Sequence, residues 1–327
     1  MRDSSNLLVD PLSDLLNFLQ VRCDLSGRLV AGGTWARRFA NLDAIKFCAV
    51  TEGGCWYSSD GMSEPARVDA GDVLITNGTR TLTLASTAAL IPNATTTPVV
   101  RDSDDQYQLG QGCDFTMLGG IVQIDTDQQA LLLNGLPPLI HVRGNTNEAE
   151  PISWLLKQLV VEMKGGRPGR AVVMAGLTHL LFVQALRAYL AHAPSGDEGW
   201  LKGFGDHRLA IVLSTIHGEP SRNWGLEELA RKAGMSRTSL AVRFREMMGI
   251  PPLAYLTQWR MYLARRELRA GASISEAAAA VGYSSESAFS SAFKRVMAVA
   301  PGQYRRTAQG EVEAPQTCGR HAPGSMS

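Results

Sequence analysis

The sequence has 327 residues, of which 45% are hydrophobic and 19% charged, so it is long enough for two globular domains with buried cores. It contains no run of eighteen apolar residues, and its first ten residues lack the basic start and apolar stretch of a secretory signal. We therefore expect a cytoplasmic protein with no membrane span. The five cysteines form no C-x-x-C pair, which argues against a disulfide framework or a zinc knuckle.

The net charge of +1 hides an uneven distribution. Residues 226–306 contain thirteen Lys or Arg and six Asp or Glu, a net charge of +7, which leaves −6 for the rest of the chain. A basic C-terminal segment on an otherwise acidic chain suggests that this segment meets a polyanion.

The first 145 residues predict a β-rich domain. Short β-type runs alternate with turn signals such as Glu52-Gly53-Gly54 and Asn77-Gly78, which is typical of a β-sandwich or barrel. The expected strand regions are Gly27–Trp35, Ile45–Tyr57, Val73–Ile75, Arg80–Ala85 and Phe115–Ile124.

The pattern then changes to helical spacing. Apolar residues at positions 152, 155, 156, 159 and 160 predict a helix over 148–163, and a second apolar helix is expected over 170–192, so that the two form a hairpin. Residues 193–199 are rich in Gly, Pro and Ser and predict a linker. These features divide the chain into residues 1–195, an all-helical region over 204–306, and a disordered tail over 307–327.

The helical region contains an internal duplication. Leu226, Ala230 and Gly234 recur 48 positions later as Ile274, Ala278 and Gly282. Beyond the turn the offset becomes 49, because the second copy has one extra residue there. At this offset the matching pairs are Leu240 and Phe289, Phe244 and Phe293, Pro252 and Pro301, and Tyr255 and Tyr304.

Each copy has the physical features of a helix-turn-helix. The alanine in the first helix allows close helix packing, and the glycine can end that helix in a left-handed conformation. Ser236 in the first copy, and Ser284 or Ser285 in the second, can cap the next helix. The paired apolar residues four apart bury one face of that helix and leave the opposite face for a DNA major groove.

A continuous helix is expected between the two copies, over residues 253–270. At 1.5 Å per residue it spans roughly 27 Å. This length can separate two recognition helices by about one turn of DNA, near 34 Å.

This region resembles the AraC/XylS family of transcription regulators. The resemblance covers about 100 residues and includes Gln258-Trp259-Arg260-Met261, the run from Val281 to Ser290, and Pro301-Gly302-Gln303-Tyr304-Arg305. The first 190 residues resemble the cupin-type sensor domain found in one branch of that family. The implied fold is α+β multidomain, with a cupin-like β-barrel or sandwich plus a helical hairpin and an all-α double helix-turn-helix. The implied function is a DNA-binding transcription regulator that binds double-stranded promoter DNA, contacts RNA polymerase and forms a homodimer.

The resemblance places DNA contacts on both recognition helices. In the first, Thr238, Ala241 and Val242 should contact base edges, although the latter two carry no hydrogen-bonding group and suit thymine methyls or shape readout. Arg237, Arg243 and Arg245 are candidates for phosphate or base contact, with a solvated surface position as the alternative. The second helix should present Glu286, Ser287, Ser290 and Ser291 to bases, and Lys294 and Arg295 to phosphates.

Two signals are open for the N-terminal domain: a small organic ligand inside the barrel, or an oxidant acting on cysteine. The branch of the family that it resembles includes regulators of reactive-chlorine stress, and Cys23 lies where some members carry a reactive cysteine. Cys113 or Cys55 could assist it, and Arg22 beside Cys23 could lower the pKa of the thiol. The alternative for each cysteine is a buried small hydrophobic residue.

Enzyme functions are disfavoured. A metal-dependent cupin enzyme needs two or three histidines and a carboxylate, but residues 1–147 contain only His141. No nucleophile elbow, phosphate-binding loop or dinucleotide fingerprint occurs, and the scattered cysteines do not suit a zinc methyl-acceptor unit. We expect no catalytic residue, no metal and no cofactor. The alternative functions are a cupin enzyme or ligand-binding module with an appended DNA-binding domain, and a protein-interaction module.

Overall fold

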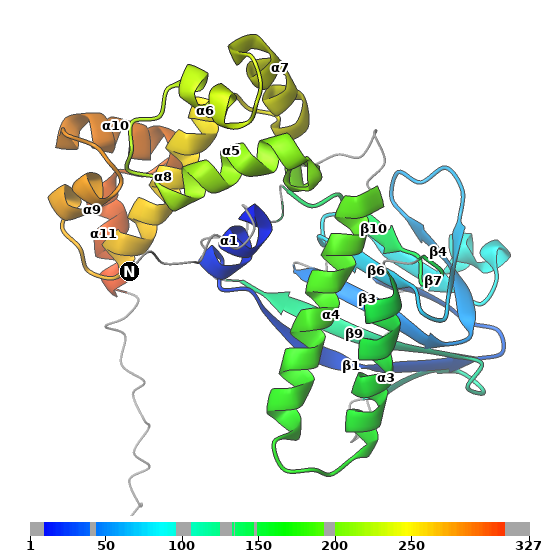
Figure 1. The fold of residues 1–327 in the computed structure, drawn as a ribbon. Coiled ribbons are helices and arrows are strands. Elements are labelled where there is room, and N and C mark those ends of the chain that lie inside the picture. The colour runs from blue at the N-terminus through cyan, green and yellow to red at the C-terminus, as the bar shows by residue number, and fades with distance from the viewer. Residues whose placement is uncertain are drawn as a thin grey trace, which may run out of the picture. The chain divides into compact units, whose positions relative to one another are not determined.

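A computed structural model describes residues 10–39, 44–95, 106–124, 133, 135–146, 149–192 and 200–310 (Figure 1). The chain folds into two compact units, one covering Met1–Ala210 with Met247–Gly249 and the other covering Ile211–Glu246 with Ile250–Ser327. The predicted linker over 193–199 lies outside the described residues, as do residues 311–327 of the predicted tail. Residues 307–310 belong to a helix, so the predicted start of that tail at 307 is wrong.

The N-terminal unit is built on two facing β-sheets. The six-stranded sheet has the order β10-β6-β3-β9-β1-β8, in which only the β1–β8 pair is parallel among the described strands, and the four-stranded sheet has the order β2-β7-β4-β5. The strands are β1 (Arg22–Gly32), β2 (Ala36–Phe39), β3 (Ile45–Glu52), β4 (Gly54–Ser59), β5 (Ala66–Asp69), β6 (Val73–Thr76), β7 (Leu82–Ala85), β8 (Gln106–Gly110), β9 (Phe115–Gln123) and β10 (Leu139–Val142).

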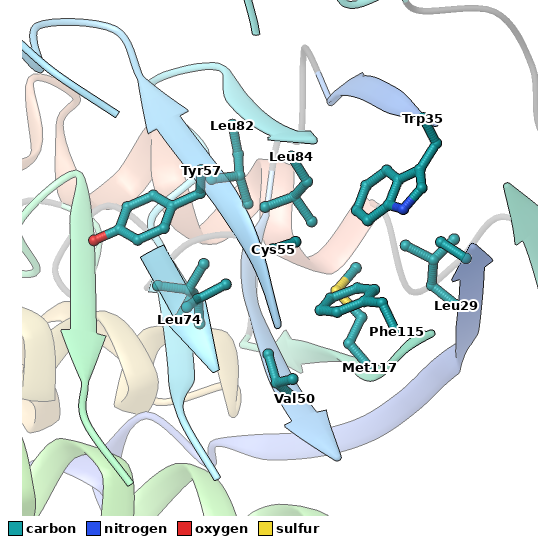
Figure 2. Packing of buried hydrophobic residues seen from close by; sticks show 12 residues of the cluster. Leu29, Trp35, Val50, Cys55, Tyr57, Leu74, Leu82, Leu84, Phe115 and Met117 are labelled. Atoms are coloured by element: carbon teal, nitrogen blue, oxygen red, sulfur yellow. The ribbon is translucent and has the colours of Figure 1, made fainter. Parts of the chain in front are cut away.

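The core of this unit lies between the two sheets. Alternation along each strand sends every second side chain into this space. Figure 2 shows Trp35 and Phe115 packed together there, with ring centroids 5.4 Å apart, beside Met117 and Leu29. Tyr57, Leu82 and Leu84 close the cluster from the smaller sheet. The predicted sandwich is therefore present.

Helices cover the outer face of the larger sheet (Figure 1). They are α3 (Glu150–Lys164) and α4 (Arg170–His192), which pack against each other as the predicted hairpin. Phe182 of α4 meets Phe47 of β3, with ring centroids 6.3 Å apart. By length and composition α4 could cross a membrane, and 39% of its most apolar stretch is buried in the structure.

The strand boundaries differ from expectation at several places. The run Ile45–Tyr57 is two strands, because Gly53 adopts φ +69° and turns the chain between β3 and β4. The first strand begins at Arg22 and ends at Gly32, so Trp35 lies beyond it. Four short strands (β2, β5, β8 and β10) and helix α1 (Pro11–Phe18) were not expected.

The C-terminal unit is entirely helical among its described residues. Its elements are α5 (His207–Gly218), α6 (Leu226–Lys232), α7 (Arg237–Met248), α8 (Pro252–Arg269), α9 (Ile274–Ala280), α10 (Glu286–Met297) and α11 (Pro301–Gly310). Figure 1 shows α8 running from the α6–α7 pair to the α9–α10 pair. Its bounds lie within one residue of the predicted connecting helix.

Candidate nucleic-acid interface and sensor pocket

The first helix-turn-helix consists of α6 and α7. Ala230 is almost fully buried, and Gly234 takes φ +62° in the turn, as its spacing predicted. The Ser236 hydroxyl accepts a hydrogen bond from the Ser239 amide at 3.1 Å and so caps α7. Leu240 and Phe244 are fully buried. Because these two side chains fix one face of α7 inward, the opposite face is presented to solvent.

The second helix-turn-helix repeats this construction with α9 and α10. Ser273 and Glu276 form a capping box at the start of α9, and these hydrogen bonds hold the pKa of Glu276 below its ordinary value. Gly282 takes φ +82° in the turn. Ser285 rather than Ser284 caps α10, accepting from the Ala288 amide at 3.4 Å. Phe289 and Phe293, both fully buried, hold α10 against the core, with ring centroids 5.6 Å apart.

The proposed DNA-contacting side chains lie on the outer faces of the two recognition helices. On α7, Ala241 is half-buried, and the others are exposed: Arg237, Thr238, Val242, Arg243 and Arg245. On α10, Ser290 is half-buried, and the others are exposed: Glu286, Ser287, Ser291, Lys294 and Arg295. On each helix, residues spaced i, i+3, i+4 and i+7 form one outward stripe, running from Thr238 to Arg245 and from Ser287 to Lys294.

Arg260 on α8 links the two helix-turn-helix motifs of the C-terminal unit, and sequence reasoning assigned it no role. The Nε of Arg260 donates to the Pro220 carbonyl at 2.6 Å, and its Nη2 donates to the Arg222 carbonyl at 2.9 Å. Its guanidinium also lies 5.6 Å from the centroid of the Tyr283 ring, in the turn of the second helix-turn-helix. Arg260 therefore connects three parts of the C-terminal unit: the segment before the first helix-turn-helix, the helix α8 and the turn of the second helix-turn-helix.

A pocket of about 300 Å³ lies in the N-terminal unit between the facing sheets. The larger sheet contributes Lys46, Cys48 and Thr76, which cross-strand register places on its inner face. The smaller sheet contributes Arg37 and Phe39 from β2. Among the described residues, no three His, Cys, Asp or Glu side chains gather as a metal site would require.

The single histidine of the β-rich region belongs to a short hydrogen-bonded chain. The Nε2 of His141 lies 2.8 Å from Asp72 Oδ2, and its Nδ1 lies 3.1 Å from the Tyr57 hydroxyl. A neutral imidazole with its proton on Nε2 donates to Asp72 and accepts from Tyr57, so all three groups are satisfied. This arrangement ties β10 to β4 and the turn before β6.

The structure places Cys23 in a poor setting for a reactive thiol. Burial, and secondarily the neighbouring Asp24 carboxylate, raises the pKa of Cys23 to about 12. Arg22 points to the opposite face because adjacent strand residues alternate, so the expectation that it lowers this pKa is wrong.

The two candidate redox cysteines also lie at opposite ends of one strand pair. Cys23 pairs with Val122 near one end of the β1–β9 ladder, whereas Cys113 is exposed and precedes Phe115, which pairs with Ala31 at the other end. At about 3.3 Å per residue, eight residues separate them by roughly 26 Å. A disulfide needs Cα atoms within about 7 Å, so the two cannot pair in this fold.

Comparison with known proteins agrees with this architecture. A family described as Cupin matches residues 10–191, and a family described as Helix-turn-helix domain matches residues 229–307. A putative AraC-like transcription regulator from Streptomyces lividans is 40% identical over 299 residues, which cover 91% of this chain and 98% of that protein. The chain belongs to the AraC-type transcription regulators.

Two further relatives match this AraC-type regulator along most of its length. A putative AraC-like transcription regulator from Streptomyces antibioticus is 39% identical, over 91% of this chain and 99% of that protein. The HTH-type transcriptional regulator MtrA of Neisseria gonorrhoeae is 29% identical, over 91% of this chain and 98% of that protein. The expected fold class, a cupin domain joined to a double helix-turn-helix, is confirmed, and so is the function as a DNA-binding transcription regulator.

Proposed function

We propose that this regulator reads promoter DNA through the outer stripes of α7 and α10, placed in consecutive major grooves of one face of the duplex. The observation that carries this proposal is the paired burial of Leu240 with Phe244 and of Phe289 with Phe293. It leaves the two stripes, and the basic side chains beside them, facing solvent. The 18 residues of α8 span roughly 27 Å, which suits a separation of about one turn of DNA.

The two helices divide the work of recognition. On α10, the Ser287, Ser290 and Ser291 hydroxyls and the Glu286 carboxylate offer hydrogen bonds to base edges, and Lys294 with Arg295 neutralises phosphates. On α7, Thr238 offers one hydroxyl while Ala241 and Val242 offer methyl groups, which suit thymine. Direct readout by α7 is therefore weaker, and its Arg237, Arg243 and Arg245 contribute chiefly affinity.

Selection from a random duplex library tests this proposal. The full chain should select a bipartite site whose two blocks are about 10 base pairs apart, and footprinting should show both on one face. Ser290→Ala with Ser291→Ala should relax preference in one block only, and Thr238→Ala should relax the other. A single block, or blocks at variable spacing, would show that the two helices do not read one site together.

We further propose that the signal is a small molecule held in the N-terminal pocket, in preference to oxidation at Cys23. The buried thiol with its raised pKa and the open pocket between the sheets both support this choice. On this proposal the chain acts in the cytoplasm, has no enzymatic activity of its own, and contacts RNA polymerase as the family resemblance implies.

Dimerisation through the α3–α4 hairpin completes the proposal. Four large apolar side chains on the hairpin are exposed by about half or more: Trp154, Val161, Val172 and Leu180. Exposed apolar groups concentrated on one pair of helices mark an interaction surface. Light scattering on the full chain should give a dimer, and Trp154→Glu with Val172→Glu should give a monomer that remains folded. A monomeric wild-type chain at micromolar concentration would contradict this part.

A further inference from the structure

Two cationic side chains face the pocket from opposite sheets. Arg37 comes from β2 of the smaller sheet, and Lys46 comes from β3 of the larger one. No Asp or Glu is among the lining residues, and no ion pair joins either cation to any part of the chain that the structure describes. Within the part of the chain that the structure describes, the charged side chains that line the pocket are therefore all cationic.

The Arg37 side chain has a buried hydrogen-bond donor to which the described residues offer no acceptor. This donor is the Nε, and burial lowers the pKa of the guanidinium from its ordinary value. A buried donor without an acceptor destabilises the folded chain, and more so when the donor is charged. An anion bound beside Arg37 would accept from this donor and offset the cost of burying the charge.

The rest of the pocket is mostly apolar. Leu29, Phe39, Leu82 and Met117 line it, and Figure 2 shows Leu29, Leu82 and Met117 around the interior of the sandwich. Gly119 on β9 also lines the pocket and, having no side chain, leaves this space open. The Arg37 guanidinium lies 5.6 Å from the Phe39 ring centroid, so charge and apolar surface meet at one point.

We propose that this pocket binds a small amphipathic organic acid, with its carboxylate between Arg37 and Lys46 and its apolar part between the two sheets. This inference rests on the proposed function in taking the pocket as the place where the signal binds. A volume of about 300 Å³ is at the lower end for small-molecule sites. The acid is accordingly a medium-chain or one- to two-ring monocarboxylate, not a long-chain lipid.

Isothermal titration of the full chain with three probes of matched chain length tests the charge preference. The probes are decanoate, decanol and decyltrimethylammonium. We expect decanoate to bind at least tenfold more tightly than decanol, and decyltrimethylammonium to show no saturable binding. Equal affinity for decanoate and decanol, or no binding of decanoate at all, would overturn the proposal.

Variants assign the binding to the two cations. Arg37→Gln and Lys46→Gln should each weaken decanoate binding roughly 10- to 100-fold, the loss expected for a charge-assisted hydrogen bond, and leave decanol binding unchanged. Arg38→Gln is the matched control, because Arg38 lies on the same strand but is exposed. If Arg37→Gln fails to fold by circular dichroism, Lys46→Gln carries the test alone. If the folded variants bind decanoate as tightly as the wild type does, the acid binds elsewhere and the assignment to Arg37 and Lys46 is wrong.

A measurement of DNA binding distinguishes failure of the pocket assignment from failure of the proposed function. Fluorescence anisotropy with the selected duplex, with and without decanoate, reports on the regulator. If decanoate binds through Arg37 and Lys46 but the chain selects no DNA, the proposed function fails while the pocket assignment stands. If the chain binds its bipartite site normally but decanoate does not bind, the pocket assignment alone fails.

Discussion

Gly282, in the turn of the second helix-turn-helix, packs directly against the backbone carbonyl of Ser221, in the segment that leads into the first. A Cβ atom at position 282 would collide with that carbonyl. Arg260 donates to the carbonyls on either side of Ser221, those of Pro220 and Arg222, at 2.6 and 2.9 Å. One turn and one arginine thus fix the relation between the two DNA-reading units, on which a bipartite site depends.

The two turn glycines of the duplication should therefore respond differently to substitution. Both have positive φ, which costs alanine about 1–2 kcal/mol, but a Cβ at Gly234 meets open space whereas one at Gly282 meets backbone. We expect Gly234→Ala to lower the free energy of unfolding by about 1 kcal/mol and Gly282→Ala by about 2–4 kcal/mol, since overpacking adds to strain. Urea denaturation of the full chain measures both. Equal losses would show that the Ser221 contact contributes nothing.

A third position in the duplication predicts a stabilising change. Gly249 ends the first recognition helix at φ +75°, and Ala298 holds the matching position after the second at φ +60°. Ala298→Gly removes the strain of a left-handed alanine, partly offset by the larger entropy of glycine in the unfolded chain. We expect a net gain of about 0.5–1 kcal/mol. The reciprocal change, Gly249→Ala, is the control and should destabilise; a loss of stability in both would contradict the account.

The sequence was most informative where a long apolar period fixed one helix face. The bounds of α4 match the prediction, and α8 differs by one residue, because burial of one stripe decides both. The strand β10 has four residues, and its pairing with β6 over 60 positions away supplies the stability that its own sequence does not. Helix α1 could have been found, since Asp10 caps it and Pro11 begins it.

The residues that line the N-terminal pocket could not be identified from the sequence, because strand register decides which side chains face the pocket. The sequence alone does not distinguish the adjacent Arg37 and Arg38. Strand alternation turns the side chain of Arg37 into the pocket and that of Arg38 to solvent. The same alternation separates Cys23 from Arg22. The outer faces of α7 and α10 were predictable because the buried pair of apolar residues recurs in both copies of the duplication. The hydrogen bonds of Arg260 were not predictable, because the carbonyls that accept them are brought to it only by the folded chain.

Lys294 and Ser290 should have separable effects on DNA binding. Lys294 is exposed on the last turn of α10, where an ammonium group can reach a phosphate. Lys294→Ala should weaken binding to all duplexes alike and reduce the slope of log affinity against log salt by about one. Ser290→Ala should keep the slope and alter base preference. Anisotropy titrations at several salt concentrations separate the two, and identical slopes for wild type and Lys294→Ala would reject the phosphate contact.

Asp72 should make the N-terminal unit sensitive to acid. Burial alone would raise the pKa of Asp72, but hydrogen bonds from His141 and from the Gly144 and Asp69 amides outweigh it and hold the pKa below its ordinary 3.8. A carboxyl with a lowered folded pKa adds stability above pH 3.8, and that stability is lost as the pH falls through the folded value. Asp72→Asn should therefore cost about 2 kcal/mol at pH 7, the scale of a hydrogen bond to a charged group.

Denaturation at pH 7 and in acid checks this dependence. The difference between wild type and Asp72→Asn should shrink as the pH falls below 3.8, because the wild-type carboxyl then becomes protonated. Asp69→Asn is the matched control, since Asp69 forms an exposed ion pair with Arg67 and should cost under about 1 kcal/mol. A constant difference at all pH values would mean that the charge on Asp72 contributes nothing.

Cysteine labelling should separate the two candidate signals. The thiolate is the reactive form, and burial raises the pKa of Cys23 and Cys55 to about 12 and that of Cys48 to about 11. We expect iodoacetamide at pH 7.5 to modify exposed Cys113 in the native chain and to leave these three cysteines unmodified over the same time. Peptide mass spectrometry gives the extent at each site, and the same reaction in guanidinium chloride should label all of them. Native labelling of Cys23 as fast as Cys113, together with an oxidant effect on DNA affinity that Cys23→Ser abolishes, would restore the redox signal and displace the ligand.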